Sequence, residues 1–354
     1  MNYKCVYECP PEFADEYAYL EYLVKEKVCQ RYVNGLSDNK IRERVEMELA
    51  TIKQRNAVSY FLIMQDSVNW AKSQKIPVGP GRNNVTCSIV AYILGITGID
   101  PLAYDLLFER FLNPELANAP EITIDVSEVG RGQLIKYIAD KYKTDPSSME
   151  RNIWEIKDLD RIRELDGKKI PLNDEKTFEI FKQGDTTDVF QFESSEMRKY
   201  LKELKPDRFE DLIAIHALSR PGIEENIPKF IRCKHGLEQI NYYHKDCEKV
   251  LGETYGNIVY MEQFMHIVQI LSGFSLGKAD IVRRAMGKSN SEELLKIKPE
   301  FITNGVKKGY SEQFLQEVWG ELMLVSHYTF GKNVSVGCAY IAYQMAYIKV
   351  HFFP

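Results

Sequence analysis

Hydrophobic residues recur at helical spacing through much of this chain of 354 residues. Between residues 12 and 55, two charged segments carry apolar residues three and four positions apart, which predicts two amphipathic helices. Residues 57–64 are instead β-branched and aromatic, which is typical of a strand, and residues 66–75 predict a helix that ends before Pro77. The apolar stripes of the first two helices are Tyr19, Leu20, Leu23, Val24 and Val28, then Ile41, Val45, Leu49 and Ile52.

The next segment combines a glycine-rich turn with an acidic strand. Residues 77–84 predict a strand that runs into the turn and then into a helix. Buried helices are expected over residues 86–95 and 100–112, the second with Asp100 as its N-cap and a proline at its first position. Residues 120–126 predict the acidic strand, and a helix is expected over 131–143.

Helical periodicity fails between residues 143 and 174, a charged segment that we interpret as a junction between two parts of the chain. Periodicity returns over residues 177–205, with an interruption at Gly184, and over residues 208–218. Residues 220–222 predict a turn, and the chain beyond residue 226 is mainly helical.

Composition places the chain among ordinary globular proteins, with 44 % hydrophobic and 27 % charged residues. A net charge of −5 argues against a large basic surface but not against one basic groove on an acidic body. The seven cysteines are scattered and form no paired CxxC motifs, which argues against a zinc site. No run reaches the ~18 apolar residues of a membrane span, and no secretory leader opens the chain, so we expect a cytoplasmic protein.

Several stretches together resemble one known family. They are residues 78–82, 99–114, 184–194, 204–214, 220–222, 254–263 and 283–288. Over nearly the whole chain from about Glu12, the sequence resembles the catalytic alpha subunit of bacterial DNA polymerase III, a C-family replicative polymerase. The resemblance implies an α+β fold, in which a palm related to the nucleotidyltransferase fold is followed by mainly α-helical fingers.

The resemblance covers only part of that family's architecture. We expect a helical lead-in over residues 1–56, a palm over 57–220 that is shortened at about 143–174, and fingers over 221–354. The family's N-terminal PHP domain, and the clamp-binding and tail domains that would follow Pro354, are expected to be absent. The family extends a primer 3′ end with deoxynucleoside triphosphates and two Mg²⁺ ions. Primer–template DNA, these nucleotides and other replisome subunits are therefore the implied partners.

The implied metal site has lost one of its acids. The resemblance places two metal-binding carboxylates on the acidic strand, at Thr123 and Asp125, and a third at Asp211. Residues two apart on a strand share a face, so Thr123 presents an uncharged hydroxyl where the family has a carboxylate. Asp125 and Asp211 are thus the implied catalytic and metal-binding residues, and we expect Mg²⁺ binding to be weakened.

The glycine-rich turn has changed in a similar way. Gly81 and Arg82 match the family, whereas Asn83 and Asn84 replace the Gly-Ser pair that lets the backbone and a hydroxyl approach the phosphates. Asparagine tolerates a left-handed backbone, so we expect the turn to persist with a bulkier floor. Near the C-terminus, Lys332 is kept.

Residues that bind phosphates are better preserved than those that react. In the fingers, Arg283, Arg284 and Lys288 match family residues that face the nucleotide and template. With Gly81, Arg82 and Lys332 they form the implied phosphate-binding set. We therefore expect lost or strongly reduced polymerase activity. Two alternatives stay open: a catalytically silent module that binds DNA or nucleotides, and a remnant or interaction protein that pairs with a full-length polymerase.

Overall fold

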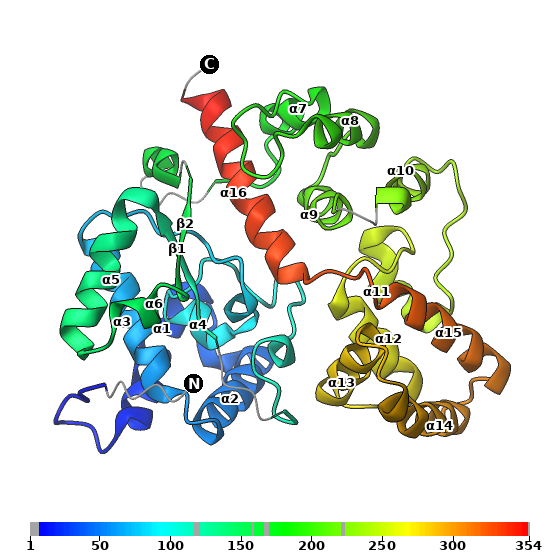
Figure 1. Cartoon of the computed structure of the whole chain (residues 1–354), viewed down its shortest axis with the longest axis horizontal. Coiled ribbons are helices and arrows are strands. Elements are labelled where there is room, and N and C mark those ends of the chain that lie inside the picture. The colour runs from blue at the N-terminus through cyan, green and yellow to red at the C-terminus, as the bar shows by residue number, and fades with distance from the viewer. Residues whose placement is uncertain (1–6, 117–120, 158, 166–169, 221–223, 353–354) are drawn as a thin grey trace. The chain divides into compact units, whose positions relative to one another are not determined.

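The computed structural model describes residues 7–116, 121–157, 159–165, 170–220 and 224–352 (Figure 1). The chain divides into two compact units, Met1–Lys169 (unit 1) and Ile170–Pro354 (unit 2). The boundary between them falls inside the segment 143–174 that we interpreted as a junction. Part of two predictions lies outside the described residues, namely Pro120 at the start of the acidic strand and Pro221 and Gly222 in the predicted turn.

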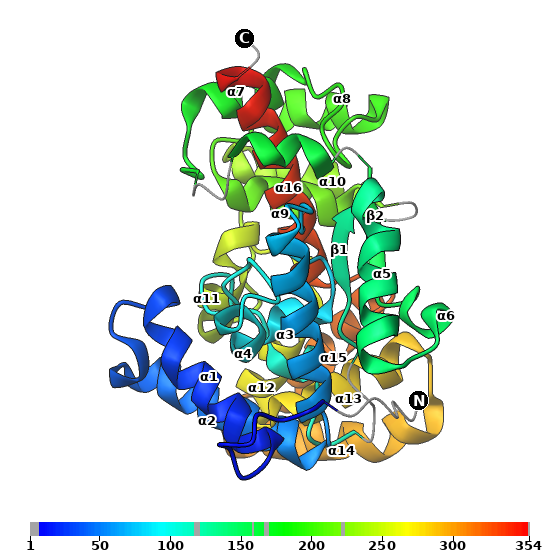
Figure 2. The same ribbon diagram turned by 90° about the vertical axis from the view of Figure 1, so that its left-hand side faces the viewer.

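Unit 1 consists mainly of helices around a small parallel sheet. The two strands, β1 (Ile124–Ser127) and β2 (Ile153–Ile156), pair from Ile124 opposite Ile153 to Ser127 opposite Ile156. Figure 2 shows α5 alongside these strands and α3 beside α5. The helices are α1 (Glu16–Arg31), α2 (Asn39–Gln54), α3 (Val58–Ser73), α4 (Ile89–Ile93), α5 (Glu128–Tyr142) and α6 (Pro146–Met149).

The predicted amphipathic helices are confirmed as α1 and α2. Each begins at an aspartate, Asp15 or Asp38, whose carboxylate accepts hydrogen bonds from backbone N–H groups of the first turn. The helix predicted over 131–143 is confirmed as α5. These elements were predictable because their apolar spacing and their caps point to the same structure.

The strand expected over residues 57–64 is wrong, because this segment forms the first half of α3. Its side chains are buried on nearly every side, so the sequence lacks the polar face that would distinguish a helix from a strand. The long helix expected over 100–112 is also wrong. The Asp100 carboxylate accepts hydrogen bonds from the Tyr32 hydroxyl and the Leu102 N–H, and Asp105 has a φ of 52°, which interrupts a helix.

The buried helix expected over 86–95 is shorter than predicted. A 3₁₀ turn covers Asn84–Cys87, and only the five residues of α4 are α-helical. The buried Glu48 explains the break, because its carboxylate accepts hydrogen bonds from the Ser88 hydroxyl and from the N–H groups of Ile89 and Val90. α4 thus begins at Ser88, whose hydroxyl accepts from the Ala91 N–H as an N-cap, and the Glu48 side chain from α2 accepts from the next two N–H groups.

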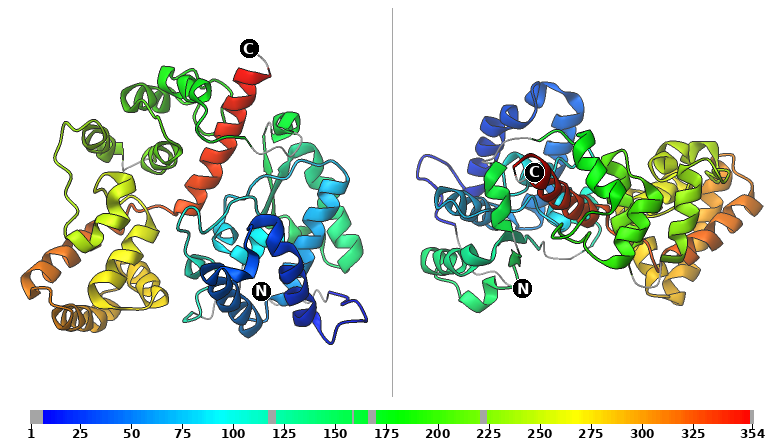
Figure 3. Two further views of the ribbon diagram at one scale, coloured as in Figure 1. Left: turned by 180° about the vertical axis from the view of Figure 1, so that it is seen from behind. Right: turned by 90° about the horizontal axis from the view of Figure 1, so that it is seen from above.

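Unit 2 is helical throughout the part that the structure describes. Its centre is α9, which is apolar and buried on almost all sides, and the long helix α16 packs against α9 and α7. Figure 3 shows helices α12 to α15 gathered into one bundle within this unit. The helices are α7 (Glu175–Gln183), α8 (Ser195–Leu204), α9 (Phe209–Leu218), α10 (Ile227–Lys234), α11 (Glu248–Leu251), α12 (Met261–Ser272), α13 (Leu276–Gly287), α14 (Ser291–Lys307), α15 (Glu312–Val325) and α16 (Lys332–His351).

The two units together give the α+β class that was predicted, with its strands confined to unit 1 among the described residues. The interruption at Gly184 is confirmed, because this glycine ends α7 with a left-handed φ of 63°. None of the helices in the described ranges combines the length and the hydropathy that spanning a bilayer would require.

Candidate functional site

In unit 1, the glycine-rich turn lies directly beside β1. Val78 forms an antiparallel bridge with Val126, and two backbone bonds flank it. The Gly79 N–H donates to the Asp125 carbonyl oxygen at 2.8 Å, and the Ser127 N–H donates to the Pro77 carbonyl oxygen at 3.1 Å. This pairing, between residues 48 positions apart at Val78 and Val126, brings two predicted elements into one local site.

Arg82 and Asp125 form an ion pair at this site. The Arg82 guanidinium donates from Nη2 to Asp125 Oδ1 at 2.9 Å and from Nε to Oδ2 at 3.2 Å, so both carboxylate oxygens accept. The Asp125 side chain is fully buried. Burial raises the pKa of its carboxyl group, and the Arg82 charge acts in the opposite direction. The structure therefore brings these two predicted residues together, but as partners of each other.

Thr123 lies just before β1 and is 5 % exposed. Its hydroxyl is buried and has no hydrogen-bond partner among the described residues. Asn83 is extended, with a φ of −121°, so the left-handed conformation that we expected asparagine to tolerate is not used there. The turn instead takes its positive φ, 95°, at Gly81, which is the glycine shared with the family.

Gly81→Ala should lower the free energy of unfolding by about 1–3 kcal/mol, because a side chain at this φ is strained. An added Cβ would also lie 2.8 Å from Thr86 Cγ2. Chemical denaturation of both the parent and the variant measures the difference. Gly132→Ala, in the middle of α5 with no atom near the new Cβ, is the matched control and should stabilise by about 0.5–1 kcal/mol. Equal effects of the two substitutions would contradict the prediction.

In unit 2, Asp211 lies in the first turn of α9 and is completely buried among cationic and hydroxyl groups. Its Oδ2 accepts from Lys234 Nζ at 2.6 Å. Its Oδ1 accepts from Arg208 Nε and from the Tyr255 hydroxyl, each at 3.1 Å. The position near a helix N-terminus is itself favourable for a carboxylate. Asp211 is thus the centre of a hydrogen-bonded cluster that includes residues from α9, α10 and the segment before α12.

Lys234 is the most enclosed cation of this cluster, with a side chain 7 % exposed. Its ammonium also donates to Asp207 Oδ1 at 2.6 Å. Burial by itself lowers the pKa of Lys234, but the bonds to Asp207 and Asp211 outweigh burial, and the net shift is upward. The bond from Lys234 in turn lowers the pKa of Asp207. Both shifts favour the charged forms of Lys234 and Asp207, and the bonds from Lys234 to Asp207 and Asp211 hold the three side chains in place.

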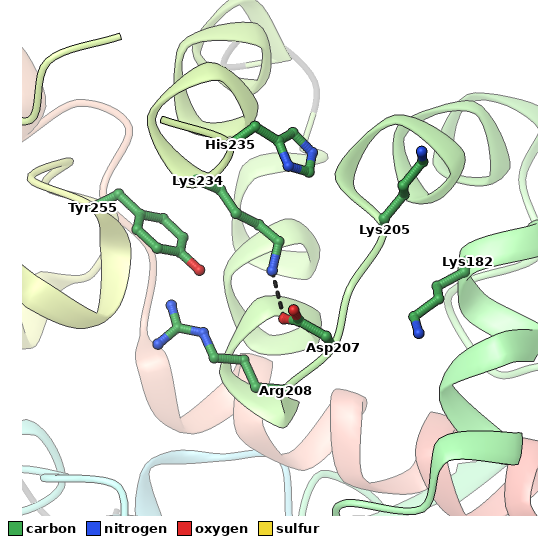
Figure 4. A pocket seen from close by; sticks show the side chains of 7 residues that line it. All are labelled: Lys182, Lys205, Asp207, Arg208, Lys234, His235 and Tyr255. Atoms are coloured by element: carbon green, nitrogen blue, oxygen red, sulfur yellow. Dashed lines mark hydrogen bonds and ion pairs between the residues drawn. The ribbon is translucent and has the colours of Figure 1, made fainter. Parts of the chain in front are cut away.

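A pocket of about 610 Å³ opens beside this cluster. Figure 4 shows Lys234 pointing toward Asp207, with the Tyr255 ring and the Arg208 guanidinium on one side and Lys182 on the other. The Arg208 guanidinium lies 4.8 Å from the centre of the Tyr255 ring. Lys205 and Tyr255 both have left-handed backbones, with φ of 48° and 52°. The lining residues are Lys182, Lys205, Asp207, Arg208, Lys234, His235 and Tyr255.

The predicted phosphate-binding residues of unit 2 fall into two groups. Lys332, 5 % exposed, pairs with the Glu253 carboxylate at 2.7 Å, and Arg208 Nη2 donates to the carbonyl oxygen of that same glutamate at 2.7 Å. Lys332 is therefore connected to the Asp211 cluster. Arg283 and Arg284 both pair with the buried Asp280, at 2.8 and 2.6 Å. Lys288 is exposed at the end of α13.

Neither implied metal ligand is arranged to bind Mg²⁺, which needs several oxygen ligands converging at ~2.1 Å. Both oxygens of Asp125 accept from Arg82, and both oxygens of Asp211 accept from Arg208, Lys234 or Tyr255. Taken separately, the described parts of the two units contain no group of three His, Cys, Asp or Glu side chains that could hold a metal ion. These residues do not fit the implied metal site in this arrangement.

Sequence reasoning missed most of the pocket. Lys205, Asp207 and Arg208 lie in one of the stretches that carry the resemblance, but nothing in that stretch shows that they surround Asp211. Lys234 is 23 residues from Asp211, and nothing in the sequence indicated that the two side chains would be in contact. The Tyr255 ring contacts Phe230, with ring centres 5.3 Å apart. Its hydroxyl bond to Asp211 was not foreseen.

Two sequence families match the chain. The family described as "Bacterial DNA polymerase III alpha NTPase domain" matches residues 18–207, and the one described as "Bacterial DNA polymerase III alpha subunit finger domain" matches residues 145–309. DNA polymerase III subunit alpha of Borreliella burgdorferi is 33 % identical over 98 % of this chain and 42 % of its own length. The proteins of the same name from Halalkalibacterium halodurans and Aquifex aeolicus are 31 % and 29 % identical. These matches cover 94 % and 98 % of this chain and 42 % and 44 % of the relatives.

The chain thus spans less than half the length of these relatives. The alignment with the Borreliella burgdorferi protein extends over 479 positions, which exceeds the 354 residues of the chain itself. That relative therefore contains residues without a counterpart here, inside the aligned region.

Proposed function

Because this chain belongs to the bacterial DNA polymerase III alpha subunit family, we propose that it is the palm and fingers portion of such a protein and that its nucleotidyl-transfer activity is lost or strongly reduced. We assign the helical lead-in to residues 1–56, the palm to 57–220 and the fingers to 221–354. Primer–template DNA and deoxynucleoside triphosphates are the ligands that this assignment favours. The cytoplasm is the compartment in which it would act, with other replisome subunits as partners.

The observation that carries the proposal is the pairing of Asp125 with Arg82 beside an uncharged Thr123. Metal-assisted nucleotidyl transfer needs anionic oxygens that converge on the metal. Here the guanidinium occupies both oxygens of Asp125, and Thr123 contributes no charge. The same guanidinium, while it pairs with Asp125, is withheld from any phosphate that approaches the turn. The site has therefore lost its excess of negative charge without gaining another reactive group.

Other members of the implied site support binding more than reaction. Lys332 is linked through Glu253 to the Asp211 cluster, and Arg283 and Arg284 are held by Asp280 on α13. Ion pairs with these acids fix the direction of the cationic side chains, which lowers the entropy lost when they contact an anion. We therefore expect the chain to keep affinity for nucleic acid or nucleotides even though its catalytic activity is lost or strongly reduced.

Primer extension by the purified unmodified chain, with Mg²⁺ and all four nucleotides, tests the proposal. We expect no extension above the level of an Asp125→Ala variant, because the carboxylate is already neutralised by Arg82. A separate fluorescence assay for primer–template binding establishes that the protein is competent to bind. Extension by the unmodified chain that Asp125→Ala abolishes would overturn the proposal and identify a working polymerase portion.

A further inference from the structure

We propose that the pocket of unit 2 is a phosphate-binding site that works without a metal ion. The ligand class is a phosphate group, carried by inorganic phosphate, pyrophosphate or a nucleotide, or by a nucleic-acid backbone. This inference goes beyond the proposed polymerase assignment, because none of the residues that line the pocket belongs to the phosphate-binding set that the resemblance implies. It stands whether or not the chain retains nucleotidyl transfer.

Positive charge predominates in the pocket. Four cationic side chains, Lys182, Lys205, Arg208 and Lys234, line it together with a single carboxylate, Asp207. The second nearby carboxylate, Asp211, is completely buried behind them. Both acids bond to the ammonium of Lys234, and Asp211 also accepts from Arg208, which leaves Lys182 and Lys205 weakly compensated.

The cations that face the opening have few partners. Lys182 lies 3.9 Å from the Glu179 carboxylate, at the outer limit of an ion pair, and Lys205 has no hydrogen bond or ion pair with any described residue. Arg208 uses Nε for Asp211 and Nη2 for the Glu253 carbonyl oxygen. Its remaining nitrogen, Nη1, has no partner within the described ranges. These donors suit a phosphate, which accepts several charge-assisted hydrogen bonds at once.

The buried side of the pocket is already ordered. Lys234 and Asp211 are bonded at 2.6 Å, and the Tyr255 hydroxyl and Arg208 donate to the same carboxylate. A phosphate would therefore meet cations whose positions are fixed before it binds, which reduces the entropic cost of binding. Lys182 and Lys205, on long flexible stems, can close over it from the opposite side.

The same contacts explain why no metal ion is needed. In a metal-dependent site the carboxylates attract the cation and the cation attracts the phosphate. Here arginine and lysine already occupy the oxygens of Asp211, so the cluster presents protein cations directly to the ligand. The volume of about 610 Å³ lies in the range of ordinary small-molecule sites and can hold a pyrophosphate or a nucleotide.

Calorimetric titration of the full chain with pyrophosphate, in low salt and excess EDTA, tests the proposal. We expect saturable binding that Lys182→Ala with Lys205→Ala weakens at least tenfold, because both cations face the opening. Lys199→Ala, an exposed lysine on α8 outside the pocket, is the matched control and should leave the affinity unchanged. Circular dichroism of each variant shows that the fold is kept, since the two pocket lysines are not buried.

Three results would overturn the proposal: no saturable binding, binding that requires Mg²⁺, or equal affinity of the double variant and the control. Competition then separates the sources of the phosphate. If primer–template DNA displaces pyrophosphate and the double variant binds this DNA tenfold less tightly, the site takes backbone phosphates. If DNA does not compete and a nucleoside triphosphate does, the site takes free phosphates. Both outcomes support a metal-independent phosphate site, and neither depends on primer extension.

Discussion

A variant carrying Thr123→Asp, Asn83→Gly and Asn84→Ser should extend a primer at least about 10³-fold faster than the unmodified chain in the presence of Mg²⁺. With a second carboxylate next to Asp125, the site would carry two negative charges against the single positive charge of Arg82. The two carboxylates together would then attract a divalent cation. Glycine and serine at positions 83 and 84 would also replace the two bulkier asparagine side chains of the turn. Rates of single-nucleotide addition to a labelled primer measure the difference.

The control for this experiment adds Asp125→Ala to the repaired variant, which should return to the background rate. A metal-dependent rise in melting temperature in the repaired variant, absent from the unmodified chain, would give a second readout of the new metal site. Equal rates for the unmodified and repaired chains would contradict the prediction. A folded but inactive repaired variant would also contradict it, and would shift attention to the residues that the longer relatives have and this chain lacks.

Asp211→Ala should lower the free energy of unfolding by about 3–5 kcal/mol. The substitution removes the carboxylate that Lys234, Arg208 and Tyr255 share, and it leaves the enclosed ammonium of Lys234 next to Arg208. Two cations without their common anion repel each other in a poorly hydrated position, which is why removing one member of a buried ion pair is costly. Urea denaturation monitored by circular dichroism measures the loss.

Asp207→Ala is the matched control, because Asp207 bonds to the same ammonium at the same distance, 2.6 Å. Its side chain is 67 % exposed, however, so water replaces much of what the carboxylate provides. We expect a loss of less than about 1 kcal/mol. If the two substitutions cost the same, Asp211 does not anchor the cluster. A large loss for Asp211→Ala alone would establish that Asp211 stabilises the fold through the protein cations that it binds.

Together these predictions concern the two acids that the resemblance implies as metal ligands, each of which pairs with protein cations in the structure. Asp125 pairs with an arginine from the glycine-rich turn, and Asp211 pairs with a lysine and an arginine of unit 2. In both, a protein cation stands where the resemblance implies a metal ion. The repaired variant tests whether the first site can be restored, and the stability of Asp211→Ala tests whether the second has become structural.

Much of the helical architecture was predictable from local sequence. The helices α1, α2 and α5 were predicted because apolar spacing and end signals agree in each of them. The family was also predictable, because stretches such as residues 184–194 and 204–214 keep their residue types and order. Loss of the charge at position 123 followed directly from that comparison, since a threonine cannot supply a carboxylate.

Only the tertiary structure decided what the remaining acids do. A run such as 57–64 is buried on all sides and has no polar face, so its helix in α3 depends on its neighbours. Similarly, the pairing of Asp125 with Arg82 arises because Val78 and Val126 lie side by side, and Lys234 of α10 bonds to Asp211 of α9 although 23 residues separate them in sequence. The energy of an ion pair depends on the distance between its two charges in space, and separation in sequence does not give that distance. The sequence by itself determined which chemical groups this protein has, and the packing of its elements determined which charges those groups meet.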